Sequence, residues 1–282
     1  ALYRMVGDFF FPGDEDFSAK EIPCEKEIKS REEFEVPLPE GNETFNSLAK
    51  KLAQDLPRAQ KGDPEAARKR LRQIVRAADY PLKMEKGDAT KAGDVTATFW
   101  KFKLADAWTV PGVEVTPPGA KGTTVLLHDG GRKEAAAELG RLLKEGQRVV
   151  AVDLFYFGES KIEQRDFLFA LTLAAVGDRP LGVQASQLTA IARGLSPEGK
   201  GPGVRVVAVG PRMSLVALTA AALEPGAIGG VELHNSWGSL KELIEKNVTV
   251  NQMPEPFCFG LLEEFDIPQL VELAGAKRVV RK

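Results

Sequence analysis

The residue types that most often build disulfides, metal sites and catalytic bases are scarce in this sequence. It contains two cysteines, Cys24 and Cys258, and two histidines, His128 and His234. No characteristic spacing pairs the cysteines, so two free thiols are expected, with a disulfide between them as the alternative. Histidine, cysteine and carboxylate side chains form no cluster at the spacing of metal ligands, so no metal is predicted.

An excess of one charge and long apolar runs are also missing. Lys plus Arg number 38 against 40 for Asp plus Glu, a net charge of -2, which gives no electrostatic case for nucleic acid or an anionic membrane. No apolar run approaches the roughly 20 residues that span a bilayer. The first residues, ALYRMVGDFFFPGD, lack the basic-then-apolar order of a signal peptide. Ala1 in place of Met suggests a mature or excised product, and an exported bacterial protein, periplasmic or extracellular, is one option.

What the sequence does contain is enough apolar material for a sizeable core, at 43% of 282 residues. We expect an N-terminal arm and helical extension over residues 1–80 and an α/β domain over residues 81–282. The arm, residues 1 to about 42, mixes phenylalanines, charges and Pro-rich turns without a sustained period. Its apolar side chains are expected to pack on the main body or on another chain. Helices are predicted from Asn42 to about Leu56 and from Asp63-Pro64 to about Arg76.

The second part of the sequence alternates between strand and helix patterns. Two strands are predicted near residues 95–104 and 113–116, before the alternation begins. The predicted parallel strands cover residues 123–127, 148–152, 204–209 and 228–233, and the predicted helices cover residues 132–144, 167–175, 183–195, 215–223 and 240–246. Apolar strands that are each followed by a helix indicate a mostly parallel sheet with helices on both faces. Such sheets bind ligands at the carboxyl ends of their strands.

The stretch from Val204 to Leu223 is the most informative one. A β-branched run ends at Gly210-Pro211, and an Ala/Leu-rich helix pattern follows. This order of strand, tight turn and helix resembles the nucleophile elbow of α/β-hydrolases, written G-x-S-x-G, in which the serine attacks the substrate. Aligned on Gly210, the elbow position is Arg212. A guanidinium stays protonated and cannot attack an acyl carbon, so the elbow lacks its nucleophile.

A second turn resembles the oxyanion element of the same class. His128, Gly130 and Gly131 close the strand at Leu127, like the His-Gly turn that supplies a backbone donor in lipases and esterases. With the backbone N–H of Met213, which follows the elbow position, this turn is the candidate oxyanion site. The next block, VVAVDLFYFGES, resembles the hydrolase segment D-x-x-G-x-G-x-S, in which Asp153 and Ser160 are expected to hold a loop.

Taken in order, these segments, with LGVQASQLTAIARGL and FDIPQLVELAGAKRVV, resemble the acetyl xylan esterase-like branch of the α/β-hydrolases. The closest likeness is to the second half of bacterial proteins with two such domains in tandem. In those proteins the resemblance implies an intact elbow in the first half and a commonly degenerate second half. It also implies that the acid and histidine of the triad would follow Arg278 to Lys282, so the α/β-hydrolase-like domain is expected to be truncated at its C-terminal end.

Other chemistries have weaker support. The nearest substitute for a triad is Ser214 with His234, although Ser214 should already lie in the helix, where a packing or helix-start role is the alternative. Ser236 and Ser239 resemble a cap for the helix at Leu240. The glycines at 199, 201 and 203 precede a strand instead of following one, so no dinucleotide or phosphate cradle is predicted and no cofactor is expected.

The sequence therefore favours a catalytically silent α/β-hydrolase-like domain. Its expected role is that of a structural or binding partner of a catalytic esterase domain or of its own copies. The alternative is a carboxylic-ester hydrolase acting on acylated carbohydrate, with Ser214 and His234 or with residues from a partner. A third hypothesis is an anion site formed by Arg212 and the helix N-terminus behind it.

Overall fold

The computed structural model describes residues 2–58, 62–162, 164, 166–196, 203–275 and 278–282. They belong to two compact units, Ala1–Thr44 and Phe45–Lys282. We call the second unit the body. This division differs from the predicted boundary at residue 80, because Leu71 and Val75 are fully buried in the core of the body.

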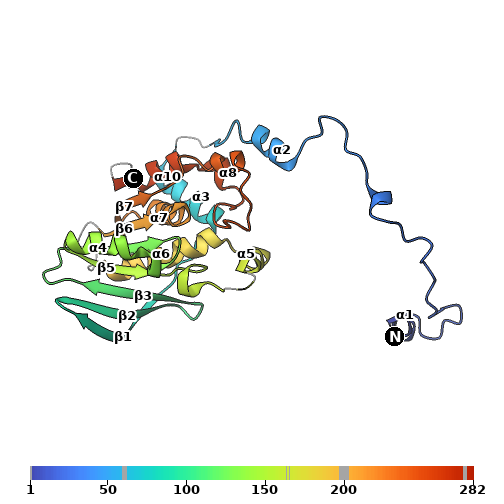
Figure 1. The fold of residues 1–282 in the computed structure, drawn as a ribbon, viewed down its shortest axis with the longest axis horizontal. Helices are drawn as coiled ribbons and strands as arrows, with labels where there is room; N and C mark the ends of the chain where they lie inside the picture. Colours follow the sequence, from blue (N-terminus) through green and yellow to red (C-terminus); the bar gives the residue numbers. More distant parts are fainter. Residues whose placement is uncertain (1, 59–61, 163, 165, 197–202, 276–277) are drawn as a thin grey trace. The chain divides into compact units, whose positions relative to one another are not determined.

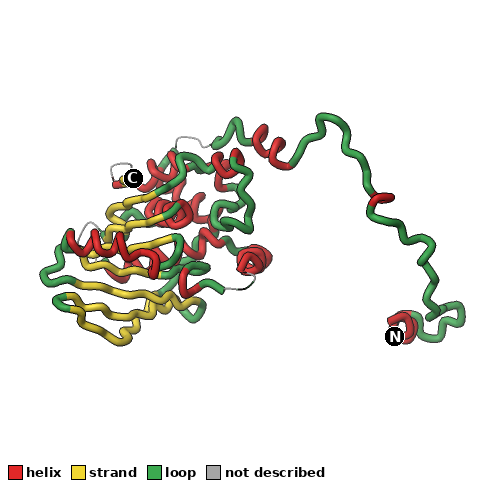
Figure 2. Tube along the Cα trace, in the orientation of Figure 1, coloured by secondary structure: helices red, strands yellow, loops and turns green. Residues whose placement is uncertain are grey.

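The body contains both strands and helices (Figure 2), which largely alternate along the chain between residues 122 and 245. Its strands are β1 (Leu82–Ala92), β2 (Val95–Leu104), β3 (Trp108–Thr116), β4 (Gly122–His128), β5 (Gln147–Val152), β6 (Val204–Val209), β7 (Ile228–His234) and β8 (Val279–Arg281). Its α-helices are α2 (Phe45–Leu52), α3 (Pro64–Val75), α4 (Ala136–Lys144), α5 (Asp166–Ala175), α6 (Pro180–Leu195), α7 (Pro211–Leu223), α8 (Lys241–Glu245), α9 (Leu261–Glu264) and α10 (Ile267–Ala274). Short 3-10 turns cover Arg132–Ala135 and Gly158–Ser160.

All eight strands form one sheet in the order β1-β2-β3-β5-β4-β6-β7-β8 (Figure 1). The first three strands pair antiparallel, and β3 also pairs antiparallel with β5. From β5 to β8 every pair is parallel. The predicted mostly parallel α/β sheet is confirmed. The crossover order brings the carboxyl ends of β4, β6 and β7 together, because β6 lies between the other two.

Helices cover both faces of this sheet, and an apolar cluster lies under each layer. The larger cluster joins α3, α6, α7 and α10 to one face. The smaller cluster joins α4 to the other face through Leu126, Leu142, Val149 and Val207. Because alternate residues of a strand point to opposite faces, Glu232 and His234 lie on the α4 face, in register with Val207 and Val209.

Local sequence signals explain where several of these elements start. Asp63 caps α3 by accepting from the backbone N–H of Ala66, as its position before Pro64 predicts. The strand over 204–209 matches its prediction, whereas α7 begins at Pro211, four residues earlier than predicted. The strand β1 was not predicted, because its charged and Gly-containing sequence carries no clear alternation. The helix α10 was not predicted either, although a capping box between Asp266 and Gln269 starts it.

The N-terminal unit contains α1 (Leu2–Phe10) and a short 3-10 turn, Glu32–Phe34, and is otherwise loop. No residue of α1 is buried. The prediction of an extended arm thus misses this amphipathic helix, whose nine residues sit at the end of the arm.

Three further predictions concern the cysteines, membrane-spanning helices and the glycines before β6. Cys24 and Cys258 are both free thiols, as predicted. Among the described helices, none has the length and apolarity to cross a membrane. Gly199 and Gly201, which precede a strand and so do not predict a phosphate cradle, lie outside the described residues.

A single glycine makes the turn from β6 to α7 possible. Gly210 has φ +100°, in the region that favours glycine, and a Cβ atom there would lie 2.3 Å from Cγ of Asp129. The chain therefore has no room for a side chain where the strand passes into the helix.

We predict that Gly210→Ala lowers the free energy of unfolding by about 2–3 kcal/mol, because it combines a strained φ with a clash. Urea denaturation measures the change. Gly226→Ala is the matched control, since a Cβ atom there meets nothing within 4 Å. Equal stability of the two variants would contradict the geometry of this turn.

Candidate functional site

The site lies where β6 passes into α7, at the carboxyl ends of β4, β6 and β7. Pro211 is the first residue of α7 and Gly210 is its N-cap. Arg212 and Met213 therefore stand in the first turn of the helix, whose free backbone N–H groups attract negative charge. In a hydrolase elbow the nucleophile would occupy the place of Arg212.

The guanidinium of Arg212 forms a two-pronged ion pair with the carboxylate of Glu255. Nε donates to Oε2 at 2.8 Å and Nη2 donates to Oε1 at 2.8 Å. The Glu255 side chain is 0% exposed and that of Arg212 is 16% exposed. The guanidinium also lies 4.3 Å from the ring centroid of Phe157 and 5.7 Å from that of Tyr156. Two of its donors and its flat face are therefore engaged by the protein itself.

Charge pairing keeps this buried arginine ionised. Burial alone would lower the pKa of Arg212, but the hydrogen bond and charge of Glu255 raise it above its ordinary value. The amide of Gln184, also fully buried, donates to Oε1 of Glu255 at 3.1 Å and to the carbonyl oxygen of Phe155 at 3.0 Å. The result is a polar network inside an apolar layer, in which Oε1 of Gln184 is a buried atom without a hydrogen-bond partner among the described residues.

A second carboxylate caps the same helix. Oδ1 of Asp129 accepts from the backbone N–H of Met213 at 2.7 Å, and Oδ2 accepts from that of Arg212 at 3.2 Å. Burial raises the pKa of Asp129 even though both N–H groups act to lower it. In an α/β-hydrolase the N–H of the residue after the nucleophile holds the oxyanion. Here Asp129 occupies that donor.

The predicted oxyanion turn directs its other donors inward as well. The N–H of Gly130 donates to Nδ1 of His128 at 2.9 Å, and the N–H of Gly131 donates to the carbonyl oxygen of His128 at 2.9 Å. A Cβ atom on Gly131 would lie 2.4 Å from Cα of Gly158, so the turn packs tightly against the neighbouring loop. The candidate donors of Gly130, Gly131 and Met213 thus all bond within the chain.

These contacts also bear on the hypothesis of an anion site. The guanidinium of Arg212 is paired with Glu255, and the helix N-terminus is capped by Asp129. An external anion would have to displace a carboxylate from Nε and Nη2 of Arg212 and from the backbone N–H groups of Arg212 and Met213. The geometry does not support the anion hypothesis.

Ser214 and His234 meet through the backbone instead of through their side chains. Oγ of Ser214 donates to the carbonyl oxygen of His234 at 3.3 Å, and Ser214 is only 2% exposed. The imidazole of His234 lies on the α4 face, with Nε2 at 2.8 Å from Glu232 and 3.7 Å from Glu138. A general base must reach the hydroxyl directly or through one water, and this ring faces away from it.

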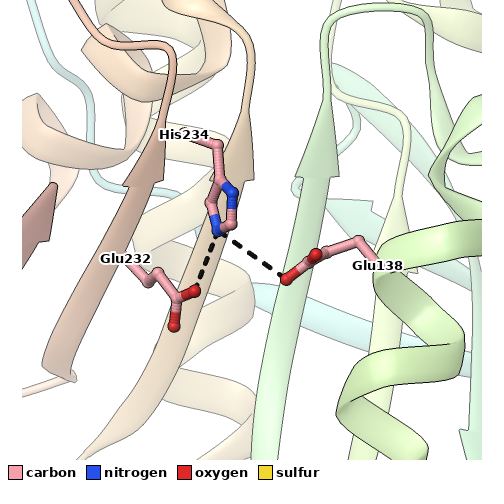
Figure 3. Close-up of side chains that lie close together, drawn as sticks. All are labelled: Glu138, Glu232 and His234. Carbon is pink, nitrogen blue, oxygen red and sulfur yellow. Dashed lines mark hydrogen bonds and ion pairs between the residues drawn. The ribbon is translucent and has the colours of Figure 1, made fainter. Parts of the chain in front are cut away.

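Figure 3 shows the imidazole of His234 pointing between Glu232 and Glu138, which come from β7 and α4. Their candidate ligand atoms all lie within 4.8 Å of one another, close enough for one metal ion. Three cationic side chains already pair with Glu232, namely those of Arg141, Arg205 and Lys282. A divalent ion would be repelled by these neighbours, so the cluster fits an ion-pair network better than a metal site.

The loop between β5 and α5 has the role expected from the sequence. Asp153 is buried and accepts from the backbone N–H groups of Arg132 at 2.7 Å and Glu159 at 3.0 Å. Its backbone carbonyl accepts from Oγ of Ser160 at 3.0 Å. Ser239, one of the two predicted caps, accepts from the N–H of Lys241 at 3.1 Å, whereas Ser236 accepts from Nε of Arg281.

Strand order, the glycine turn into α7 and the loop held by Asp153 together define an α/β-hydrolase fold. Solved structures agree. A protein of Bacteroides fragilis provisionally assigned as an acetyl xylan esterase superposes with a TM-score of 0.67 at 14% identity, over 85% of this chain and 75% of that one. Acetyl xylan esterase 1 of Thermoanaerobacterium sp. JW/SL YS485 gives a TM-score of 0.49 at 16% identity, over 82% and 81%. The superposition with a TM-score of 0.67 supports an acetyl xylan esterase-like α/β-hydrolase fold for this chain.

A third similar structure is an acetyl xylan esterase from Paenibacillus sp. R4, with a TM-score of 0.46 at 14% identity, over 81% of this chain and 80% of that one. No protein-family model and no curated protein matches the sequence. At these identities the likeness concerns the fold.

The two carboxylates that define the site, those of Glu255 and Asp129, were not predicted from the sequence. Glu255 lies in a stretch without helix or strand, MPEPFC, where no periodicity marks a buried partner for an arginine. Asp129 stands inside the quoted turn, directly before two glycines, but only the strand order places it beside α7. Gln184 is one of several polar residues in the buried helix α6. Because buried polar groups are normally hydrogen-bonded, these residues could have indicated an internal polar network.

We predict that Glu255→Gln lowers the free energy of unfolding by about 3–5 kcal/mol, because it leaves the Arg212 cation buried without a counter-charge. Urea denaturation at neutral pH measures it. Arg212→Met combined with Glu255→Met should cost less than Glu255→Gln alone, because no charge is then stranded. Glu65→Gln is the control, since this carboxylate is 80% exposed and pairs only at the surface. A loss no larger than that of the control would contradict the buried pair.

A second prediction concerns the acid stability of the Glu232 network. Burial would raise the pKa of Glu232, but hydrogen bonds from Lys282, Arg205 and His234 outweigh it and lower the pKa from 4.5 to about 2. Its stabilising contribution is therefore complete above about pH 4.5 and is lost as the pH falls toward 2. We expect Glu232→Gln to lower the unfolding free energy by about 2–3 kcal/mol at pH 7.

The difference between wild type and Glu232→Gln should shrink from pH 4.5 downward, and chemical denaturation across this range measures it. Glu85→Gln provides a surface control with two lysine partners, Lys83 and Lys103. A difference that stays constant down to pH 2.5 would show that Glu232 is not held ionised by this network.

Proposed function

We propose that this chain is a catalytically silent α/β-hydrolase-like domain that acts as a structural or binding partner of a catalytic esterase domain or of its own copies. The observation that carries the proposal is the state of the elbow. A guanidinium stands at its apex in a bidentate pair with Glu255, and a carboxylate from Asp129 occupies the donors behind it.

Two physical effects oppose ester hydrolysis at this place. A protonated guanidinium is no nucleophile. A carboxylate bonded to the N–H of Met213 would also repel the negative charge that develops on the carbonyl oxygen in the transition state. Loss of a single oxyanion donor typically costs a factor of about 100–1,000 in kcat. Here the N–H of Met213 is also bonded to a carboxylate, which has the same negative charge as the oxyanion.

The alternative is a carboxylic-ester hydrolase acting on acylated carbohydrate. Its support is the similar fold of the Bacteroides fragilis protein that is provisionally assigned as an acetyl xylan esterase. In this chain it depends on Ser214 and His234, or on residues from a partner. The hydroxyl and the imidazole would have to turn toward each other before Ser214 could be deprotonated.

We predict no turnover of p-nitrophenyl acetate above the uncatalysed rate and no labelling by a fluorophosphonate probe. An active esterase of similar fold serves as the positive control. Arg212→Ser should remain inactive, because it leaves Asp129 on the N–H of the following residue. Turnover that disappears in Ser214→Ala would overturn the proposal in favour of the alternative.

A further inference from the structure

The N-terminal unit begins with a small apolar structure, residues 2–17, which we call the N-terminal knob. The helix α1 is followed by a turn that brings the rings of Phe11 and Phe17 into a stack, with centroids 5.0 Å apart. On the helix itself Phe9 is 77% exposed and Phe10 is 73% exposed. An apolar cluster of this kind is costly in water, which indicates a surface that another protein covers.

The segment between the knob and the body is long enough to reach a second molecule. Residues 20–44 hold one 3-10 turn, Glu32–Phe34, and no other helix or strand. Fully extended, these 25 residues would span roughly 80 Å, farther than the diameter of a domain of this size. A second molecule is therefore within range of the knob.

The body carries an apolar surface of its own around α5. Apart from Asp166 and Thr172 the helix sequence DFLFALTLAA is entirely apolar, and a helix that is apolar all round is normally buried. Here large apolar side chains remain exposed on α5 and next to it. We call this set the α5 patch: Leu168, Leu171, Val176, Phe257 and Phe259.

Two arginines border the α5 patch. The guanidinium of Arg179 lies 5.2 Å from the ring centroid of Phe259, and that of Arg76 donates to the carbonyl oxygen of Gly177. These contacts tie the loop of Phe259, the end of α3 and the turn after α5 into one surface. The patch is thus apolar, and its edge carries Arg76, Arg179 and the exposed Asp178.

The N-terminal unit and the body carry opposite net charge. Residues 1–44 contain 12 acidic and 5 basic side chains, whereas residues 45–282 contain 28 acidic and 33 basic ones. Within the knob the acidic side chains are Asp8, Asp14, Glu15 and Asp16. An acidic, apolar knob is therefore attracted to a positively charged body, on which the α5 patch offers the apolar surface that it needs.

We propose that the N-terminal knob of one copy packs on the α5 patch of a second copy. Exchange in both directions gives a closed two-fold dimer, in which each chain supplies one knob and one patch. This proposal rests on the proposed function in naming a second copy as the binding partner. It does not require the elbow to be catalytically inactive. Oligomeric state and ester hydrolysis are measured separately, so either idea can fail alone.

Sedimentation equilibrium of the full chain tests the dimer. We expect a concentration-dependent dimer whose Kd rises at least tenfold in Phe9→Asp/Phe10→Asp and equally in Leu171→Asp/Phe259→Asp. Val36→Asp and Phe99→Asp are the controls, since both side chains are exposed but lie outside the knob and the patch. Circular dichroism and thermal unfolding verify that each variant keeps the wild-type fold.

Mixing the two double variants gives a sharper test. Each retains one intact surface, so their mixture should form a dimer through a single knob and a single patch, more tightly than either variant dimerises alone. Higher salt should weaken the wild-type dimer because the N-terminal unit and the body carry opposite net charge. A wild-type chain that is monomeric at 100 μM overturns the proposal, as does an unchanged dimer in Leu171→Asp/Phe259→Asp. A monomer whose knob instead cosediments with phosphatidylcholine vesicles would also overturn it.

Discussion

The pairing of Arg212 with Glu255 determines how the rest of the elbow is arranged. A charge that is 0% exposed costs several kcal/mol unless an opposite charge meets it with good geometry, and here two parallel hydrogen bonds of 2.8 Å provide that. Gln184 fixes the carboxylate from the side, and the ring of Phe157 lies against the flat face of the guanidinium. Each of these contacts favours a protonated, immobile arginine at the apex of the turn.

Asp129 extends the same principle to the backbone. The first turn of α7 presents unpaired N–H groups, and a hydrolase would reserve them for a transient oxyanion. A resident carboxylate there stabilises the helix end at all times. Helix capping and transition-state binding compete for the same donors, and in this structure capping has them. The interior of the elbow thus resembles a protein core more than a binding site.

The main features of the fold were predictable from local patterns. The run Val204–Val209, the break at Gly210 and the helix behind it are encoded in adjacent residues, and the α/β alternation follows from apolar strands of regular spacing. The antiparallel edge strand β1 was not, since its lysines and glycine favour neither face. Arg212 at the elbow was also visible in the sequence. Its partner Glu255 was not, because it comes from a segment without regular structure, 43 residues away. Tertiary pairing of this kind leaves no periodic trace.

The resident carboxylate at Asp129 limits how a serine elbow could arise in this chain. A serine in place of Arg212 would gain a nucleophile and at once leave Glu255 buried without its counter-charge. Removing Glu255 first would leave the Arg212 cation buried without its counter-charge. Even after both changes, Asp129 would still cover the donor that the reaction requires. Each single step lowers stability before any step adds activity, so selection for a stable fold would itself preserve the elbow in its present form.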